Sequence, residues 1–262
     1  MFYAKLNESI LMKKLVESIK DIVSEINLEV NPVGINLQAM DASHVALVSV
    51  QLSSEGFSEY RCDKAMNLGI QVSQFWKLMK CGGNDDCLIL KSTFDSSSLN
   101  IRFENNKLKK CCDFNLNLIQ IDSEHLGIPD TTYGSEIKMS SNEFNRITKE
   151  LYAISETVNI ETSKSYISFN VTSDSVNGGI KIDSNDSSSQ EEMTLVKVEE
   201  PVNLNFALRY LNMFTKATAL AEQVILSLSV EYPLRVEYKL ANLGTLQYFL
   251  APRISEENAQ NN

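Results

Sequence analysis

A repeat in the order of its predicted elements constrains this chain most. Most segments alternate apolar and polar residues with period two, which is typical of antiparallel strands that have one buried face. Such strands include 98–104, 166–171 and 224–232. Four segments instead show helical periodicity, at 9–23, 73–81, 141–154 and 205–220. The order strand, helix, several strands, helix, several strands therefore occurs twice, and it predicts two domains of similar topology, each with two helices packed on strands.

A boundary between the two halves is predicted at 118–134, which contains Gly127, Pro129 and Gly134. Two further stretches, 184–192 and the C-terminal SEENAQNN, are too polar to bury and predict unstructured chain. We therefore expect an N-terminal domain at 1–117, a connecting loop at 118–134, a C-terminal domain at 135–254 and a tail at 255–262.

Two of the helices carry signals for their ends. Ser73 is available as an N-cap for the second helix, and Gly82-Gly83 would suit a left-handed turn after it. Ser140 and Glu143 have the spacing of a capping box at the start of the third helix.

Composition bounds the class of protein. With 262 residues, 43% of them apolar, the chain can bury a core without disulfides. Its five cysteines are irregularly spaced and no secretory signal is expected, which favours a reducing compartment. No apolar run approaches the ~18 residues of a membrane span.

The charge of the chain is segregated. The formal net charge is −10, from 24 basic and 34 acidic residues. The four predicted helices hold nine of the cations and four of the anions, which leaves 15 basic and 30 acidic residues elsewhere. The helices are thus at +5 and the remainder at −15, so the net value conceals a basic set of helices.

Each predicted helix has two cations spaced three or seven residues apart, a spacing that places both on one helix face. These pairs are Lys13 and Lys20, Lys77 and Lys80, Arg146 and Lys149, and Arg209 and Lys216. For one helix a solvated polar face is the simpler interpretation, but four such helices favour a shared polyanion such as the DNA backbone. No aromatic residue is expected to interleave with these cations as a stacking platform, which predicts phosphate contact without base readout.

Motifs for catalysis are missing from the sequence. The two histidines, His44 and His125, lie far apart, and Cys111-Cys112 is adjacent, which does not suit zinc. The sequence contains no nucleophile elbow, P-loop or dinucleotide fingerprint, and CGGNDD at 81–86 lacks the lysine of a phosphate loop. We expect no catalytic residues, no metal and no cofactor.

Five segments spread over both halves resemble one known family. They are LQAMDASHVALV (37–48), SEGFSEYRCD (54–63), LGIPDTTY (126–133), FALRYLNMFTKAT (206–218) and VEYKLANLGTLQYFLAP (236–252). Together they resemble proliferating cell nuclear antigen, the eukaryotic sliding clamp family, over nearly the whole chain to about Ile254. The resemblance implies an α+β clamp fold, in which three subunits close head to tail into a homotrimeric ring with helices lining the hole.

The resemblance also implies a function. A clamp of this family encircles duplex DNA without sequence preference, serves as processivity factor for replicative polymerase, and docks replication and repair proteins through a short peptide motif. The implied partners are DNA polymerase delta, the clamp loader, flap endonuclease and DNA ligase, in the nucleus, with no membrane and no small-molecule substrate. A checkpoint-type paralogue in a heterotrimeric ring and an enzyme with an unrecognised site are the alternatives.

The DNA-facing positions implied by the resemblance are nearly all on the predicted helices. They are Lys13, Lys14, Lys20, Lys77, Lys80, Lys110, Arg146, Lys149, Arg209 and Lys216. Asn117 departs from a common lysine of the family, which predicts a modest loss of phosphate contact.

A groove for client peptides is implied under the connecting loop. Its positions are Met40, His44, Val45, Leu47, Leu126, Ile128, Pro129, Tyr133, Tyr232, Pro233, Phe249, Ala251 and Pro252. Taken alone, Met40 and Leu47 would be interpreted as core and His44 as a structural histidine. Phe249 replaces a common tyrosine, and Thr131 and Thr132 differ from the family's typical loops, so client preference can differ too.

The subunit joint is implied at two strands, 109–117 and 175–183. Its positions are Lys110, Cys112, Phe114, Leu116, Ser175, Asn177, Gly178, Ile180 and Ile182. Ordinary internal strands would fit the same patterns. Lys164 matches the family's ubiquitin acceptor, which is linked to translesion synthesis; by itself it is a surface lysine beside a turn.

Overall fold

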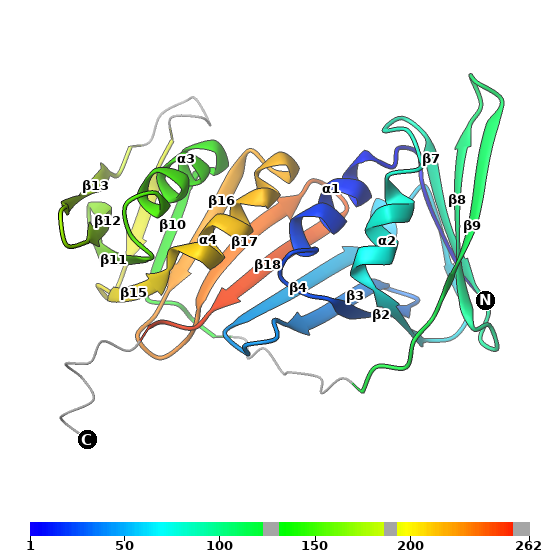
Figure 1. The fold of residues 1–262 in the computed structure, drawn as a ribbon, viewed down its shortest axis with the longest axis horizontal. Coiled ribbons are helices and arrows are strands. Elements are labelled where there is room, and N and C mark those ends of the chain that lie inside the picture. The colour runs from blue at the N-terminus through cyan, green and yellow to red at the C-terminus, as the bar shows by residue number, and fades with distance from the viewer. Residues whose placement is uncertain (123–130, 186–192, 254–262) are drawn as a thin grey trace. The chain divides into compact units, whose positions relative to one another are not determined.

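The computed structural model describes residues 1–122, 131–185 and 193–253 (Figure 1). The chain divides into two compact units, Met1–Gly127 with Leu240–Leu246, and Ile128–Lys239 with Gln247–Asn262. Along the described chain, one strand, one helix, five strands, a second helix and three strands follow in order, and then the same order recurs. The predicted repeat is confirmed.

Residues 1–122, all of which the structure describes, contain two α-helices and nine strands. These are β1 (Phe2–Leu6), α1 (Ile10–Ile19), β2 (Glu25–Asn31), β3 (Gly34–Met40), β4 (Ala46–Ser53), β5 (Glu59–Cys62), β6 (Met66–Gln71), α2 (Val72–Met79), β7 (Cys87–Ser92), β8 (Ser98–Asn105) and β9 (Lys110–Asn117), with a 3-10 turn at Ser54–Gly56. One antiparallel sheet has the order β5-β1-β7-β8-β9, and β4-β3-β2-β6 are neighbours in a second.

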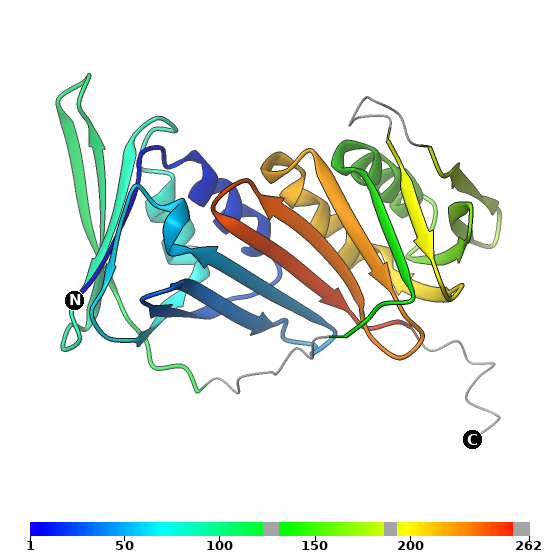
Figure 2. The same cartoon turned by 180° about the vertical axis from the view of Figure 1, so that it is seen from behind.

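Alternation along the strands builds the core of this unit. In β8, Leu99, Ile101 and Phe103 are buried while the residues between them are not, as the period-two pattern predicts. In Figures 1 and 2, α1 and α2 lie side by side over one face of β2, β3 and β4. Met12 of α1 and Phe75 of α2 are among the buried side chains that hold them there.

The second half repeats this plan. Its elements are β10 (Ser135–Ser140), α3 (Ser141–Tyr152), β11 (Thr157–Ser163), β12 (Tyr166–Thr172), β13 (Asn177–Asp183), β14 (Leu195–Val198), β15 (Asn203–Ala207), α4 (Leu208–Phe214), a 3-10 helix (Thr215–Leu220), β16 (Gln223–Leu228), β17 (Leu234–Leu240) and β18 (Gly244–Leu250). One sheet has the order β13-β12-β11-β15, and β14-β10-β16-β17-β18 are neighbours in another. In the core, the rings of Phe214 and Tyr248 stack 4.4 Å apart and those of Phe144 and Phe169 lie 6.4 Å apart.

The signals predicted at the ends of α2 are wrong. Strand β6 runs directly into α2, and the first helical N–H, that of Val72, donates to the carbonyl of Ser24, so Ser73 lies inside the helix. Gly82 and Gly83 do not adopt the left-handed conformation. Gly82 instead permits close packing, because a Cβ there would lie 2.2 Å from the Phe103 ring.

The cap predicted for α3 is confirmed in part. The Ser140 hydroxyl accepts from the backbone N–H of Glu143 at 3.5 Å. The return bond of a capping box is replaced, since the Glu143 carboxylate pairs with Arg146.

The fourth predicted helix, 205–220, is not one continuous α-helix. Its α-helical part ends at Phe214, and Thr215–Leu220 continues as 3-10 helix. The Thr215 hydroxyl donates to the carbonyl of Asn212, three residues back, an arrangement that competes with regular helical bonding.

Parts of the predicted loops lie outside the described residues, namely 123–130, 186–192 and 254–262. Within the predicted unstructured stretch, Ser184 and Asn185 are described and are bonded. The N–H of Asn185 donates to the carbonyl of Thr194 at 2.7 Å, and the N–H of Thr194 returns the bond at 2.9 Å, so the prediction is wrong for Asn185.

Candidate functional site

The cations of the first unit's helices lie away from the core. Helix α2 buries Val72, Phe75 and Met79, and leaves Lys77 and Lys80 exposed. Helix α1 buries its Leu15 side, and the predicted DNA-facing residues Lys13, Lys14 and Lys20 are half-buried. Helices α1 and α2 pack side by side (Figure 1), so the lysines of the two helices belong to neighbouring elements of one unit.

Lys13 differs from the other lysines because it is tied to the loop after α2. Its ammonium group donates to the Gly82 carbonyl and lies 3.3 Å from Oδ1 of Asn84. Burial lowers the pKa of Lys13, against the opposing effect of Asp86. Lys13 therefore fastens this loop to α1, which lessens what it can offer to an external anion.

An aromatic ring lies between two of the lysines. The ring centroid of Trp76 is 5.9 Å from Nζ of Lys20 and 5.7 Å from Nζ of Lys80. Lys20 also pairs with Asp21 at 3.0 Å. The expectation that no aromatic residue interleaves with the cations is wrong for this helix pair, because Lys20 and Trp76, far apart in sequence, meet across two helices.

In the second unit, Arg146 is compensated within its own helix. Its guanidinium pairs with Glu143 at 2.5 Å and with Glu150 at 3.3 Å, three residues before it and four after it. The hydrogen bonds that Arg146 donates to Glu143, together with the charges of both carboxylates, raise the pKa of Arg146 well above its usual value. Lys149 on the same helix is exposed and belongs to no ion pair among the described residues. Lys149 is thus the more available of the predicted pair.

Arg209 and Lys216 are both exposed, although they do not belong to one continuous α-helix. Arg209 belongs to α4, whereas Lys216 lies in the 3-10 segment, where each residue advances by about 120° rather than 100°. The Arg209 guanidinium lies 4.9 Å from the ring centroid of Tyr210 and donates to its hydroxyl. Only the last two of the seven steps are 3-10, so they add about 40° in total and the seven-residue spacing still places both side chains on about the same side.

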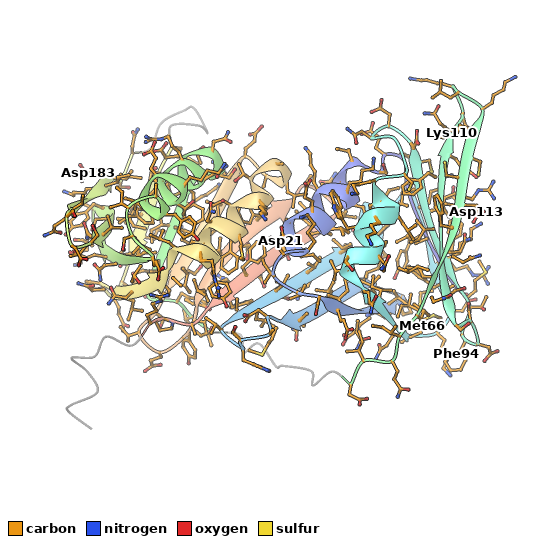
Figure 3. The ribbon with its side chains drawn as sticks, viewed as in Figure 1. Asp21, Met66, Phe94, Lys110, Asp113 and Asp183 are labelled. Carbon is orange, nitrogen blue, oxygen red and sulfur yellow. The ribbon has the colours of Figure 1, made fainter. Side chains whose placement is uncertain are left out.

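Lys110 comes from a strand and not from a helix. It is exposed at the start of β9, and Asn117 is exposed at the end of the same strand. Figure 3 labels Lys110 and Asp113 along this strand.

The residues Asp41–Ala46 form a tight loop between β3 and β4, held by one buried carboxylate. Oδ1 of Asp41 accepts from the N–H of Val45 and of Ala46, both at 2.8 Å, and Oδ2 accepts from Ser43 at 3.1 Å. His44 stands at the tip in the left-handed conformation, with φ of 55°. The loop is therefore built by Asp41, which the sequence analysis did not single out.

Beside this loop lie the apolar groove positions predicted in the first unit. Met40 pairs with Leu47 across β3 and β4. Met40 is 36% exposed, and Val45 and Leu47 are half-buried, so none of the three belongs to the core. A cluster of apolar side chains at the surface is typical of a protein-binding site.

The groove positions predicted in the second unit include an aromatic cluster. The rings of Tyr133 and Tyr232 lie 6.3 Å apart in an edge contact, and the Tyr133 hydroxyl donates to the Pro233 carbonyl at 3.3 Å. Burial raises the pKa of Tyr133. Arg235, which sequence reasoning missed, stacks 4.8 Å from the Tyr133 ring centroid and donates to Ser227.

The remaining residues predicted to line the groove differ from one another in burial. Phe249 is 7% exposed and belongs to the core, whereas Ala251 and Pro252 are half-buried. Leu126, Ile128 and Pro129 lie outside the described residues.

Two family models match the chain in succession. The model described as "Proliferating cell nuclear antigen, N-terminal domain" matches residues 1–125, and the one described as "Proliferating cell nuclear antigen, C-terminal domain" matches residues 127–253. The chain belongs to the proliferating cell nuclear antigen family. It is thus a member of the sliding clamps, and its α+β architecture of helices on antiparallel sheets is the DNA clamp fold.

The strands predicted to join subunits of this clamp family member are both outermost in their sheets. β9 ends the order β5-β1-β7-β8-β9, and β13 ends the order β13-β12-β11-β15. On β9, Cys112, Phe114 and Leu116 point to the side of the buried β8 residues; on β13, Ile180 and Ile182 point to the side of Phe169 and Ile167. Asn177 and Gly178 are exposed on β13, and Ser175 lies before that strand begins.

Lys164 is exposed in the two-residue turn between β11 and β12, next to Ser165. The turn leaves its side chain accessible, which a modification site requires.

Within the described ranges 1–122, 131–185 and 193–253, no group of three or more His, Cys, Asp or Glu side chains could hold a metal ion. None of the helices in these ranges has the length and apolarity for crossing a membrane.

Proposed function

We propose that this clamp family member closes head to tail into a homotrimeric ring that encircles duplex DNA and serves as a polymerase processivity factor. The observation that carries the proposal is the gathering of cations on the outward faces of helices in both units, within a chain of net charge −10. Lys20, Lys77 and Lys80 represent this set in the first unit, and Lys149 and Arg209 in the second.

The mechanism is topological. Lysine and arginine contacts to phosphate carry no sequence information and exchange readily, so a ring that encloses DNA can slide along it. Dissociation requires the ring to open, so the individual contacts can stay weak. The chain needs no catalytic group for this activity, and we propose that it is not an enzyme.

Client proteins are proposed to dock on the two apolar surfaces described above. Met40 and Leu47 supply adaptable apolar contacts in the first unit, since the methionine thioether fits varied shapes. Tyr133 and Tyr232 supply aromatic contacts in the second. A short client peptide that forms one helical turn, with two aromatic residues, suits such surfaces.

Membership of the family supports several finer assignments as proposals. We propose DNA polymerase delta, the clamp loader, flap endonuclease and DNA ligase as partners, the nucleus as location, and Lys164 as the modified residue in translesion synthesis. We also propose the division into 1–117, 118–134, 135–254 and 255–262.

Primer extension on a linear template tests enclosure directly. Without a clamp loader, a ring can thread over the open ends and lengthen the products of a polymerase. Blocking both ends with bulky protein should remove this stimulation. Stimulation that survives blocked ends would show that the protein helps by surface contact and not by encircling DNA.

Two controls complete the test. A variant with the nine predicted basic residues other than Lys110, which is also a predicted position of the joint, changed to alanine should remain a trimer and lose stimulation. The mass of the purified protein should be three times 29.4 kDa. A protein that stays at 29.4 kDa alone and assembles only with other chains would instead be a subunit of a heterotrimeric, checkpoint-type ring.

A further inference from the structure

The single tryptophan of the chain lies in the basic surface of the first unit. Trp76 is half-buried on α2, on the flank that meets α1, while Phe75 and Met79 of the same helix are fully buried. Lys20 from α1 and Lys80 from α2 approach its ring from two helices. The largest aromatic side chain therefore lies among cations and not in the core.

The contacts of these lysines with the ring are loose. Separations of 5.9 and 5.7 Å are close to the limit of about 6 Å for a cation–π interaction. Lysine has a flexible stem of four carbons, so both ammonium groups can turn toward phosphates while the ring stays in place. Lys20 would exchange its partner Asp21 for a phosphate in doing so.

An aromatic ring flanked by cations has the chemistry of a single-strand binding site. Such sites combine a positive track for the backbone with an aromatic face on which a base stacks, and they tolerate any sequence. In duplex DNA the base faces are stacked on one another, so a ring of this kind has a use only where bases are unpaired.

The helices of the second unit offer no equivalent platform among the described residues. There Arg209 lies over Tyr210, but Tyr210 is only 5% exposed, so its face is not open to a base. Among the described helices the feature therefore belongs to the α1–α2 surface, whereas the pairs of Arg235 with Tyr133 and of Lys181 with Tyr166 involve strands.

We propose that the α1–α2 surface binds single-stranded nucleic acid, with one unpaired base stacked on Trp76 and the neighbouring phosphates on Lys20 and Lys80. The proposal rests on the proposed function in one respect, that this surface faces nucleic acid. It adds a second ligand, the unpaired strand, to the duplex. The simpler alternative is that Trp76 has only a structural role and stabilises the packing of α1 against α2 through its contacts with the two lysines.

Three ligands of equal length distinguish these possibilities. They are a 20-nucleotide oligo-dT, an abasic 20-mer with the same phosphates but no bases, and a 20-base-pair duplex, all at one salt concentration because phosphate binding depends on salt. Because the chain has one tryptophan, its emission reports on this position alone. Oligo-dT should quench the emission of the intact protein, and the abasic strand and the duplex should leave it nearly unchanged.

Matched variants then test the ring itself. Trp76→Leu keeps an apolar side chain but has no stacking face, and it should weaken oligo-dT binding by at least about fivefold, the low end for loss of one stacked base. Trp76→Phe should retain most of the affinity. Neither change should alter duplex binding, measured by anisotropy of labelled DNA. The double variant Lys20→Gln with Lys80→Gln should weaken the binding of all three ligands.

Equal quenching by abasic strand and oligo-dT, or unchanged oligo-dT affinity in Trp76→Leu, would overturn the stacking proposal. If Trp76→Leu fails to fold, the quenching comparison on the intact protein still decides. An intact protein that binds the duplex but not oligo-dT sinks this inference alone, whereas an intact protein that binds none of the three ligands sinks the proposed function as well.

Discussion

At the scale of single residues, Asp41 shows how one buried carboxylate shapes a surface. It accepts three backbone N–H groups of the loop that carries His44. Hydrogen bonds to a charged group are stronger than neutral ones, and each N–H left without a partner would cost stability. The apolar surface of Met40 and Leu47 adjoins this loop, so its shape depends on a residue that touches no client.

We expect Asp41→Ala to lower the free energy of unfolding by ~3 kcal/mol, since three donors lose a charged acceptor. It should also weaken client-peptide binding. Urea denaturation and calorimetry measure the two effects. Ser43→Ala, in the same loop, is the control and should change neither. Normal stability of Asp41→Ala would mean that the backbone holds this loop without the carboxylate.

Asp86 is a second residue whose ionised form supports the fold. The N–H of Gly83 and the amide of Asn105 both donate to its carboxylate at 2.6 Å. These bonds, that from Gly83 foremost, hold the pKa of Asp86 below its usual value. A depressed folded-state pKa gives stability that is present above the unfolded pKa, about 3.9, and is lost as pH falls through the folded value.

Stability should therefore fall more steeply in the natural protein than in Asp86→Asn between about pH 4 and pH 2, the window below the unfolded aspartate pKa. Urea midpoints of both proteins, measured across this pH range, give the difference in stability between them. The other carboxylates contribute equally to both proteins and drop out of this difference. Parallel curves would show that the charge of Asp86 contributes nothing to folding.

At the scale of elements, α3 shows that a cation on a helix face is not always available. Glu143 and Glu150 lie one turn on either side of Arg146 and pair with it. An arriving phosphate must displace these carboxylates, and their charges repel it. Lys149 lacks both obstacles.

Glu143→Gln with Glu150→Gln should strengthen duplex binding and steepen its salt dependence, because Arg146 becomes available to phosphate. Lys149→Ala should weaken binding more than Arg146→Ala does. Anisotropy of labelled duplex over a salt series measures both. The charge-matched control is Glu136→Gln with Glu199→Gln, two exposed residues outside α3. Equal gains in duplex affinity in the two double variants would indicate that the effect comes only from the change in net charge.

The elements themselves could be predicted from periodicity, because burial of one face imposes it. All four helices occur where apolar spacing placed them, and Leu99, Ile101 and Phe103 face inward as their alternation predicts. The ends were harder to predict. Helix α2 begins at Val72 because the Ser24 carbonyl accepts its N–H, and no local pattern reveals a partner so distant in the sequence.

The candidate sites could be predicted less completely, because contacts between residues that are distant in the sequence leave no local pattern. The spacing of Glu143, Arg146 and Glu150 was visible in the sequence and could have revealed the compensation. The meeting of Lys20 with Trp76 could not, since it requires α1 and α2 to pack together. Arg235 became noticeable only when its guanidinium was seen over Tyr133.

At the scale of the whole molecule, assembly is proposed to depend on two outermost strands. The outer edges of β9 and β13 present backbone N–H and C=O groups to which, in the described chain, no further strand is hydrogen-bonded. Such edges pair readily with another chain. Phe114 on β9 and Ile180 on β13 are half-buried in the monomer, so a joint between these strands can cover their remaining surface.

Ile180→Asp should therefore shift the protein from trimer toward monomer, since pairing would bury an uncompensated charge. Sedimentation velocity at micromolar concentration measures the shift from three times 29.4 kDa to 29.4 kDa. Val33→Asp is the matched control, because Val33 is 76% exposed and lies on neither edge strand. A trimer that persists in Ile180→Asp would exclude β13 from the joint.

The shared element order of the two units affects how easily a ring of this protein would slide along DNA. A ring of three chains with two units each would surround DNA with six copies of one plan. Duplex DNA completes a turn in about 10.5 base pairs, so the lining and the phosphate helix have no common rotational period. As such a ring advances, some cations gain a phosphate while others lose one, so the total interaction energy between ring and DNA changes little. The mismatch between the symmetry of the ring and that of the duplex would therefore allow smooth sliding.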